Sequence, residues 1–185
     1  MKRDAEATRK RILEAATTEF SRYGLAGARV DRIAEAANSN KAMIYAYFGS
    51  KEGLFDAVGT ELIAWHVQDV PLDTYNLPEY AARVFDRYQN HPELMRLVNW
   101  DRLERSGERV QPKEIVKSIE GKVSAIRQAQ EDGVVSRHFP TPLLLELILA
   151  LVELRPNTAG PTDEPAHAAR RQAIKDAVGR LVSDS

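Results

Sequence analysis

Apolar side chains recur at spacings of three and four residues along nearly the whole chain, and no stretch alternates convincingly between apolar and polar residues. Spacings of three and four place side chains on one face of an α-helix, whereas alternation would indicate a strand. Proline and glycine interrupt the pattern at short intervals, as at His91-Pro92 and Gly133. The sequence therefore predicts an all-α protein of about nine helices with short connections.

The breaks in the pattern give approximate bounds for these helices. Gly24 would end the first helix, Ser50 would cap the fourth, and Thr162 or Asp163 would cap the last, with Pro165 in its first turn. We expect helices at about 4–23, 30–37, 40–48, 51–68, 78–90, 92–105, 112–132, 141–155 and 163–182.

Composition excludes several classes of protein. The chain has 185 residues, of which 43% are hydrophobic, so it can bury a core and is not expected to be disordered. It has no Cys, which removes disulfides, thiolate zinc sites and iron–sulfur clusters. The longest apolar run, 143–154, is broken by Glu146 and Glu153 and is too short to span a membrane, and the charged N-terminus does not resemble a signal peptide. We expect a cytoplasmic protein with no membrane association.

Catalytic and metal-binding patterns are also missing from the sequence. The four histidines are dispersed, and Glu164-Pro165-Ala166-His167 is a lone Glu-x-x-His, whereas a di-iron bundle needs two such motifs. No nucleophile elbow and no phosphate-binding glycine loop occurs. We expect no enzyme activity, no metal and no cofactor.

Charge is distributed unevenly although the net charge is only −1. Residues 1–51 carry ten basic and six acidic side chains, an excess of four positive charges, which leaves the remainder at −5. A basic N-terminal part on an acidic body is typical of a protein whose N-terminal part meets a polyanion, although an ordinary solvated surface would explain the charge alone equally well.

Two of the predicted helices, 30–37 and 40–48, are short and lie only a few residues apart, which is the form of a helix-turn-helix. Ala34 and Ala37 supply small residues where the helices cross, and Asn38 tolerates the positive φ that the turn requires. Ile44 and Phe48 lie four residues apart, so they hold the second helix against the core. Lys41, Ala42 and Tyr45 then point outward.

The segment Ile33–Leu54, IAEAANSNKAMIYAYFGSKEGL, closely resembles the DNA-binding signature of the TetR/AcrR family of bacterial transcriptional repressors. The resemblance is specific over about residues 9–60. It implies an N-terminal helix-turn-helix domain, residues 1–50, and a ligand-binding and dimerisation domain, residues 51–185.

The resemblance also implies which side chains meet DNA. Lys41, Ala42 and Met43 occupy the positions that meet base edges in the major groove, and Tyr45, Tyr47 and Lys51 those that contact phosphates. A lysine can donate to guanine and an alanine can touch a thymine methyl group, which suits these roles. Core packing is the alternative for the tyrosines, above all for Tyr47.

Three positions depart from the family pattern. Asn38 replaces a common Gly, Ser39 replaces an apolar residue, and Ala28-Arg29 stands where Thr usually caps the helix. Loss of the apolar contact and of the cap should each cost at most about 1 kcal/mol. Arg29 would compensate by binding a phosphate.

The helix expected at 92–105 is apolar over most of its circumference, yet Asp101 and Glu104 lie within its apolar arc. One explanation is salt bridges to Arg83, Arg87 or Arg127. The other is a pocket for a small, mostly apolar effector, in which the carboxylates favour a cation. The residues expected to line such a pocket are Trp65, Phe85, Tyr88, Met95, Trp100, Asp101 and Glu104.

The last two predicted helices suit a dimer interface. Helix 141–155 is apolar nearly all round, and helix 163–182 carries a ridge of alanines that lets another helix approach closely. The resemblance implies that these helices pair with those of a second copy, through Leu147, Leu151, Ala166, Ala169, Ala173, Ala177 and Leu181. A core within one chain is the alternative.

The sequence therefore predicts a ligand-responsive regulator, most simply a repressor that binds a palindromic duplex operator as a homodimer and is released by a small-molecule effector. The alternative is a helix-turn-helix architectural or partner-docking protein without an effector. The size of the C-terminal domain, about 130 residues, argues against that alternative.

Overall fold

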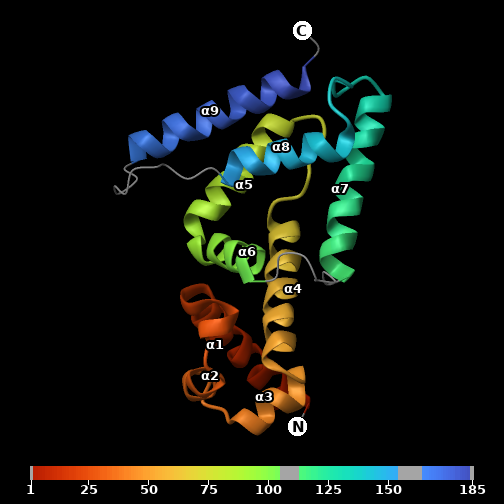
Figure 1. The fold of residues 1–185 in the computed structure, drawn as a ribbon. Coiled ribbons are helices and arrows are strands. Elements are labelled where there is room, and N and C mark those ends of the chain that lie inside the picture. The colour runs from red at the N-terminus through yellow and green to blue at the C-terminus, as the bar shows by residue number, and fades with distance from the viewer. Residues whose placement is uncertain (1, 105–112, 154–163, 184–185) are drawn as a thin grey trace. The chain divides into compact units, whose positions relative to one another are not determined.

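A computed structural model describes residues 2–104, 113–153 and 164–183, with the side chains of all of these except residues 2–4, 63–69 and 114–115. Within these ranges the chain forms nine α-helices and no strand (Figure 1). The helices are α1 (Lys2–Gly27), α2 (Val30–Ala36), α3 (Lys41–Phe48), α4 (Lys51–Asp69), α5 (Leu77–Asn90), α6 (Pro92–Glu104), α7 (Lys113–Glu131), α8 (Thr141–Glu153) and α9 (Glu164–Val182). The predicted all-α class is confirmed, and the helix bounds lie close to those expected.

The helices divide into two compact units. Unit 1 comprises Met1–Trp65 and His91–Ile115, and so contains α1, α2, α3, most of α4, and α6. Unit 2 comprises His66–Asn90 and Val116–Ser185, and so contains α5, most of α7, α8 and α9. The division between the two units falls within α4, between Trp65 and His66. The domain boundary expected after residue 50 stays a prediction.

Unit 1 is built around the aromatic and aliphatic side chains of α1. Phe20 is fully buried, and its ring meets that of Phe55 on α4 edge to face, with 5.0 Å between the centroids. Ile12, Ile33 and Ile44 are also fully buried in this core, and Leu97 of α6 joins it. The apolar faces of α1, α2, α3 and α6 therefore share one core.

Local sequence signals set most of the helix ends. The Asn40 side chain accepts a hydrogen bond from Met43 N at 2.8 Å, and Ser50 Oγ accepts one from Gly53 N at 3.0 Å, so both are N-caps. Asn38 has a φ of 47°, as the turn requires. Gly24 breaks the helical dihedrals with a φ of 68°, but helical turns resume and α1 runs on to Gly27. The cap expected for α9, Thr162 or Asp163, lies outside the described residues.

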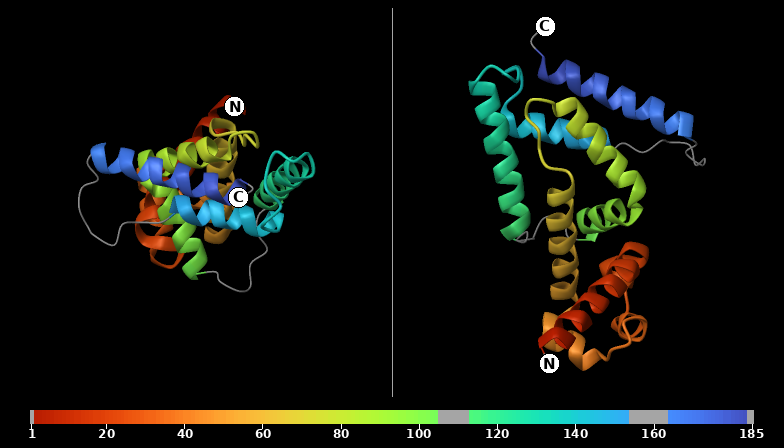
Figure 2. Two further views of the ribbon diagram at one scale, coloured as in Figure 1. Left: turned by 90° about the horizontal axis from the view of Figure 1, so that it is seen from above. Right: turned by 180° about the vertical axis from the view of Figure 1, so that it is seen from behind.

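In unit 2, α5 packs against both α9 and α8, and α8 also contacts α9 (Figures 1 and 2). Tyr80 and Phe85 of α5, Leu144 of α8 and Val178 of α9 are completely buried in its core. Ion pairs add to this contact, because Arg171 of α9 binds Glu79 and Asp86 of α5. The face of α9 that carries Ile174 and Val178 therefore points toward α5.

Candidate nucleic-acid interface

The helix-turn-helix of α2 and α3 is held together by its turn. Ser39 N donates to Ala34 O at 2.9 Å and Asn38 N donates to Glu35 O at 3.0 Å, which close the end of α2. Ile33 and Ile44 are both fully buried, one on each helix. This packing fixes which face of α3 remains outside.

The outer face of α3 is polar and aromatic. Lys41 and Ala42 are exposed, and Met43, Tyr45 and Tyr47 are 39%, 44% and 38% exposed. These large side chains stand out from a helix whose Ile44 is fully buried. Tyr47 is not packed in the core, and its hydroxyl donates a long hydrogen bond, 3.4 Å, to Ala5 O of α1. The five expected DNA contacts on α3 therefore share one accessible surface.

Lys41 has a partner that the sequence analysis did not identify. Its Nζ lies 2.6 Å from Oδ1 of Asp31, a residue in the first turn of α2. The hydrogen bond that Lys41 donates to Asp31, reinforced by the negative charge of Asp31, raises the pKa of Lys41 above its ordinary value. The residue expected to read bases is thus already paired in the free protein.

The other two basic residues expected at DNA lie at the link between α1 and α2. Lys51 Nζ donates to Ala26 O at 3.4 Å and to Ala28 O at 3.3 Å, so its ammonium joins α4 to this link. The Arg29 side chain is exposed, and its backbone precedes α2 in an extended conformation. Both cations therefore flank the same short segment.

A carboxylate from α1 binds one backbone N–H group at the start of α2, although not the one that a Thr cap would bind. Arg29, the N-cap residue of α2, makes no side-chain capping bond, but its backbone N donates to Oε1 of buried Glu19 at 2.9 Å. The same oxygen accepts from Arg32 Nε at 2.8 Å, and the Arg32 guanidinium also lies over the Tyr23 ring. The sequence analysis assigned no role to Glu19. The signal that could have identified it is a carboxylate on the buried face of the first helix.

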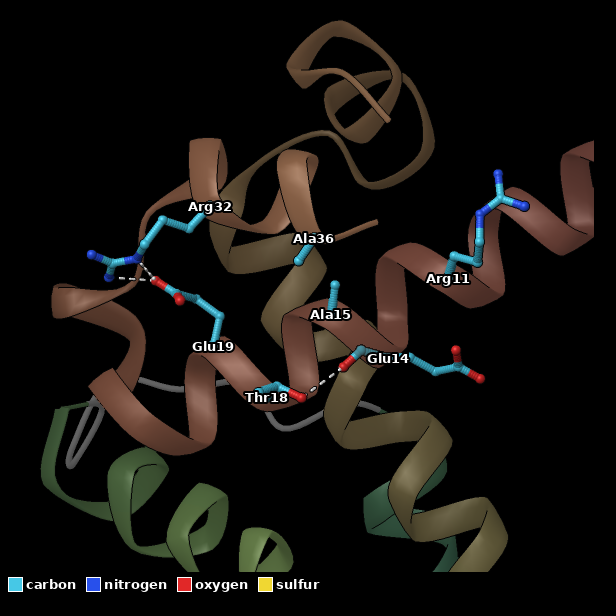
Figure 3. A pocket seen from close by; sticks show the side chains of 7 residues that line it. All are labelled: Arg11, Glu14, Ala15, Thr18, Glu19, Arg32 and Ala36. Carbon is cyan, nitrogen blue, oxygen red and sulfur yellow. Dashed lines mark hydrogen bonds and ion pairs between the residues drawn. The ribbon is translucent and has the colours of Figure 1, made fainter. Parts of the chain in front are cut away.

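A shallow hollow of about 460 Å³ lies between α1 and α2 (Figure 3). In the figure the Glu19 and Arg32 side chains meet at one end, while the Arg11 and Glu14 side chains extend away from them. Charged side chains dominate its lining, and none of the residues expected in the effector pocket is among them. The hollow is lined by Arg11, Glu14, Ala15, Thr18, Glu19, Arg32 and Ala36.

Glu104, expected in the effector pocket, binds backbone amides in the last turn of α1, just after the break at Gly24. Its Oε2 accepts from Leu25 N at 2.6 Å and from Ala26 N at 3.1 Å. Nearby, Trp100 Nε1 donates to Ser21 O at 3.3 Å. These bonds replace the salt bridges that the sequence offered as the structural explanation for Glu104, and they join α6 to the end of α1.

The other residues expected in the effector pocket divide between the units. In unit 1, Met95 is buried and Asp101 is half-buried. In unit 2, Phe85 is buried and stacks on the His167 ring at 5.1 Å, while Tyr88 packs against the edge of the core. The side chain of Trp65 lies outside the described residues. The pocket therefore stays a prediction.

The alanine ridge expected at a dimer interface is exposed in the single chain. Ala166, Ala169 and Ala173 are exposed, and Ala177 and Leu181 are half-buried. On α8, Leu147 and Leu151 are half-buried and Leu143 is 42% exposed. Ala166, Ala169 and Ala173 thus lie away from the face of α9 that packs on α5, whereas Leu181 packs against the core of unit 2.

Two further properties concern membranes and metals. Among the helices that the structure describes, none combines the length and apolar character that a membrane span requires. The described side chains contain no group of three or more His, Asp or Glu residues arranged to hold a metal ion.

Comparison with protein families matches both parts of the chain. Residues 12–58 match the family described as bacterial regulatory proteins, tetR family. Residues 76–180 match the family described as tetracyclin repressor-like, C-terminal domain. Together these matches cover the helix-turn-helix and most of unit 2.

Individual relatives agree with the family matches. The chain is 42% identical over 150 residues to the HTH-type transcriptional repressor SCO4008 of Streptomyces coelicolor, covering 80% of this chain and 78% of that protein. It is 38% identical over 106 residues to the HTH-type transcriptional repressor NicS of Pseudomonas putida, covering 54% and 50%. Among solved structures, the putative transcriptional regulator SCO4942 from Streptomyces coelicolor superimposes with a TM-score of 0.81 and 34% identity, over 96% of this chain and 99% of that one.

Proposed function

The chain belongs to the TetR family of bacterial transcriptional regulators, and we propose that it represses transcription by binding a palindromic operator as a homodimer. The single observation that carries this proposal is the outer face of α3, where Lys41, Met43, Tyr45 and Tyr47 are exposed around a fully buried Ile44. Large side chains on a short exposed helix suit the major groove, which admits one α-helix.

Each side chain has a role that its chemistry supports. Lys41, Ala42 and Met43 lie in the first turn of α3 and read base edges. Tyr45, Tyr47, Lys51 and Arg29 hold phosphates and fix the register of the helix on DNA. Lys51 is well suited to this role because its link to Ala26 and Ala28 already fixes its position.

Dimerisation follows from the small number of bases that one reading helix can reach. A second copy doubles the contacts and places two reading helices about 34–36 Å apart, one turn of B-DNA. The exposed alanine ridge of α9 and the half-buried Leu147 and Leu151 of α8 form the interface, because small residues let helices of two chains pack closely.

Release from DNA is assigned to a small, mostly apolar and cationic effector that binds near Trp100. Support comes from α6, whose Trp100 and Glu104 are hydrogen-bonded to the end of α1 next to the segment that Lys51 holds. A ligand that moves α6 would therefore alter the link that precedes α2. To act as a switch, it must distinguish the two states by about 1–3 kcal/mol.

The test of DNA binding begins with selection of duplexes from a random pool by the wild-type protein. A palindromic consensus is expected, and Lys51→Ala should weaken binding to all duplexes while Lys41→Ala chiefly relaxes base preference. Lys117→Ala, an exposed lysine on α7, serves as the control and should change neither. Equal effects of Lys41→Ala and Lys51→Ala on selected and random duplexes would contradict the assigned roles.

The test of effector binding is a thermal-shift screen of lipophilic cations, with neutral and anionic compounds of similar size as controls. A ligand that binds the folded state raises its melting temperature, and by linkage the selected duplex must weaken its binding by the same factor. If no compound class shifts the melting temperature or weakens operator binding, the chain acts as a DNA-binding protein without an effector, which was the alternative reading of its sequence.

A further inference from the structure

The ion pair between Asp31 and Lys41 lies beside the proposed reading surface. Asp31 is the second residue of α2 and Lys41 is the first residue of α3, and the carboxylate and the ammonium are 2.6 Å apart. Both side chains reach solvent, with Asp31 70% and Lys41 53% exposed. A carboxylate thus stands next to the lysine that the proposed function brings to DNA.

The stability that this carboxylate adds to the fold is small, because an acidic residue in the first turn of a helix contributes about 0.3–1 kcal/mol. Exposed ion pairs contribute about 0–1 kcal/mol, because water and salt screen both partners. On a DNA-binding surface, a negative charge also opposes the phosphates and weakens attraction to every duplex. An acidic residue at this place therefore lowers the affinity for DNA, and its small contribution to stability does not explain its presence.

Lysine chemistry suggests what the carboxylate does. A lysine ammonium is a compact charge on a flexible chain, so an unrestrained Lys41 could bind any phosphate within reach. It has three N–H donors, of which Asp31 needs one. The remaining two match the acceptors O6 and N7 that guanine presents in the major groove.

We propose that Asp31 is a specificity-determining residue that acts through Lys41, orienting its ammonium toward a base edge and lowering affinity for DNA of arbitrary sequence. The contact with a guanine keeps the ion pair, whereas the contact with a phosphate breaks it. Discrimination therefore comes from a penalty on the wrong contact as well as from the right one. This inference rests on the proposed function, since it assumes that α3 reads bases.

The experiment compares Asp31→Asn with Glu35→Gln. Both variants remove one negative charge from α2, and Glu35 is exposed. Fluorescence anisotropy would measure the Kd of wild type and both variants for a duplex selected by the wild type and for a scrambled duplex of equal length and composition, at several salt concentrations. Melting curves would check that all the variants remain folded.

Asp31→Asn is expected to bind the scrambled duplex about tenfold more tightly than wild type, while its affinity for the selected duplex does not exceed that of Glu35→Gln. The ratio of the two affinities then falls about tenfold, and the salt dependence on scrambled DNA becomes steeper because a freed lysine displaces a counterion. Glu35→Gln should tighten binding to both duplexes equally and leave the ratio unchanged.

A Lys41→Ala background distinguishes action through Lys41 from a direct effect of the charge. In a protein that carries Lys41→Ala, adding Asp31→Asn should change the ratio of the affinities for the selected and scrambled duplexes no more than adding Glu35→Gln does. Equal ratios for the two single variants, or a loss of discrimination that persists without Lys41, would overturn the inference. If the wild type selects no preferred duplex, the proposed function itself fails, so the two failures are distinguishable.

Discussion

Gly24 occupies a position where no other residue fits without strain. Its φ of 68° favours glycine, and a Cβ there would lie 2.5 Å from Glu104 Oε1 and 2.8 Å from two Trp100 ring carbons. We predict that Gly24→Ala lowers the free energy of unfolding by about 2–3 kcal/mol, because backbone strain and a steric clash act together. Urea unfolding followed by circular dichroism would measure the loss.

Gly121→Ala is the matched control for this residue. Gly121 lies inside α7, has ordinary helical dihedrals, and an added Cβ there would meet no atom within 4 Å. Alanine should therefore stabilise the protein by about 0.5–1 kcal/mol. A loss of stability in both variants, or in neither, would contradict this account of Gly24.

Helix α6 is joined to the end of α1 by the Glu104 carboxylate, which accepts two backbone N–H groups. We predict that Glu104→Ala lowers the free energy of unfolding by about 1–2 kcal/mol, because two amides at the end of α1 lose a charged acceptor. Both amides donate to the same oxygen, Oε2, so the amide oxygen of Glu104→Gln can accept both bonds without the charge, and this variant should lose about half as much. Urea unfolding would measure both.

Glu120→Gln, at an exposed position of α7, provides the comparison and should leave stability unchanged. Unaltered stability of Glu104→Ala would instead favour the purely ligand-binding role that the sequence suggested. Operator binding by the two Glu104 variants would then show whether the link influences α2 and α3.

Helices α5 and α9 are joined by a second polar contact, centred on Glu79. The hydrogen bond that Lys175 donates to Glu79 lowers the pKa of Glu79 below its ordinary value of 4.5. A hydrogen bond from Arg171 lowers this pKa further, by a smaller amount. Because the folded pKa is the lower one, this contribution is fully present above about pH 5 and is lost as the pH falls through the folded pKa.

Glu79→Gln should therefore lower the free energy of unfolding by about 1 kcal/mol at pH 7, and the difference from wild type should shrink toward pH 3. Urea midpoints measured between pH 7 and pH 3 would follow this change. A difference that is the same at every pH would show that the charge of Glu79 does not stabilise the contact.

At the scale of the whole molecule, assembly depends on the exposed alanine ridge of α9. We predict that Ala173→Glu breaks the proposed dimer, because a long charged side chain prevents close approach of two helices and would be buried between them. Light scattering should show half the mass of the wild-type assembly. Operator affinity should fall with it, since both half-sites must be held at once.

Ala168→Glu is the control on the same helix. Ala168 is also exposed, but it lies about 140° around α9 from Ala173 at 100° per residue. This variant should keep the wild-type mass. An unchanged mass for Ala173→Glu would remove the ridge from the interface.

The sequence by itself determined the helices, most of their ends and the outer face of α3. These features depend on the spacing of apolar residues and on caps such as Asn40 and Ser50, whose partners lie within three residues. The resemblance of Ile33–Leu54 then indicated the family, because the residues that form a DNA-reading surface on one short helix lie close together in the sequence.

Only the tertiary structure decided which partners the charged side chains take. A helical wheel placed Glu104 on an apolar face, but it could not show that Glu104 binds amides 78 and 79 residues earlier. Nor does the sequence show that Glu19 binds the backbone N–H group of Arg29 at the start of α2. The pairing of Asp31 with Lys41 likewise depends on how α2 crosses α3. Periodicity shows which side of a helix is covered, whereas the identity of the covering atoms depends on contacts between elements distant in the sequence.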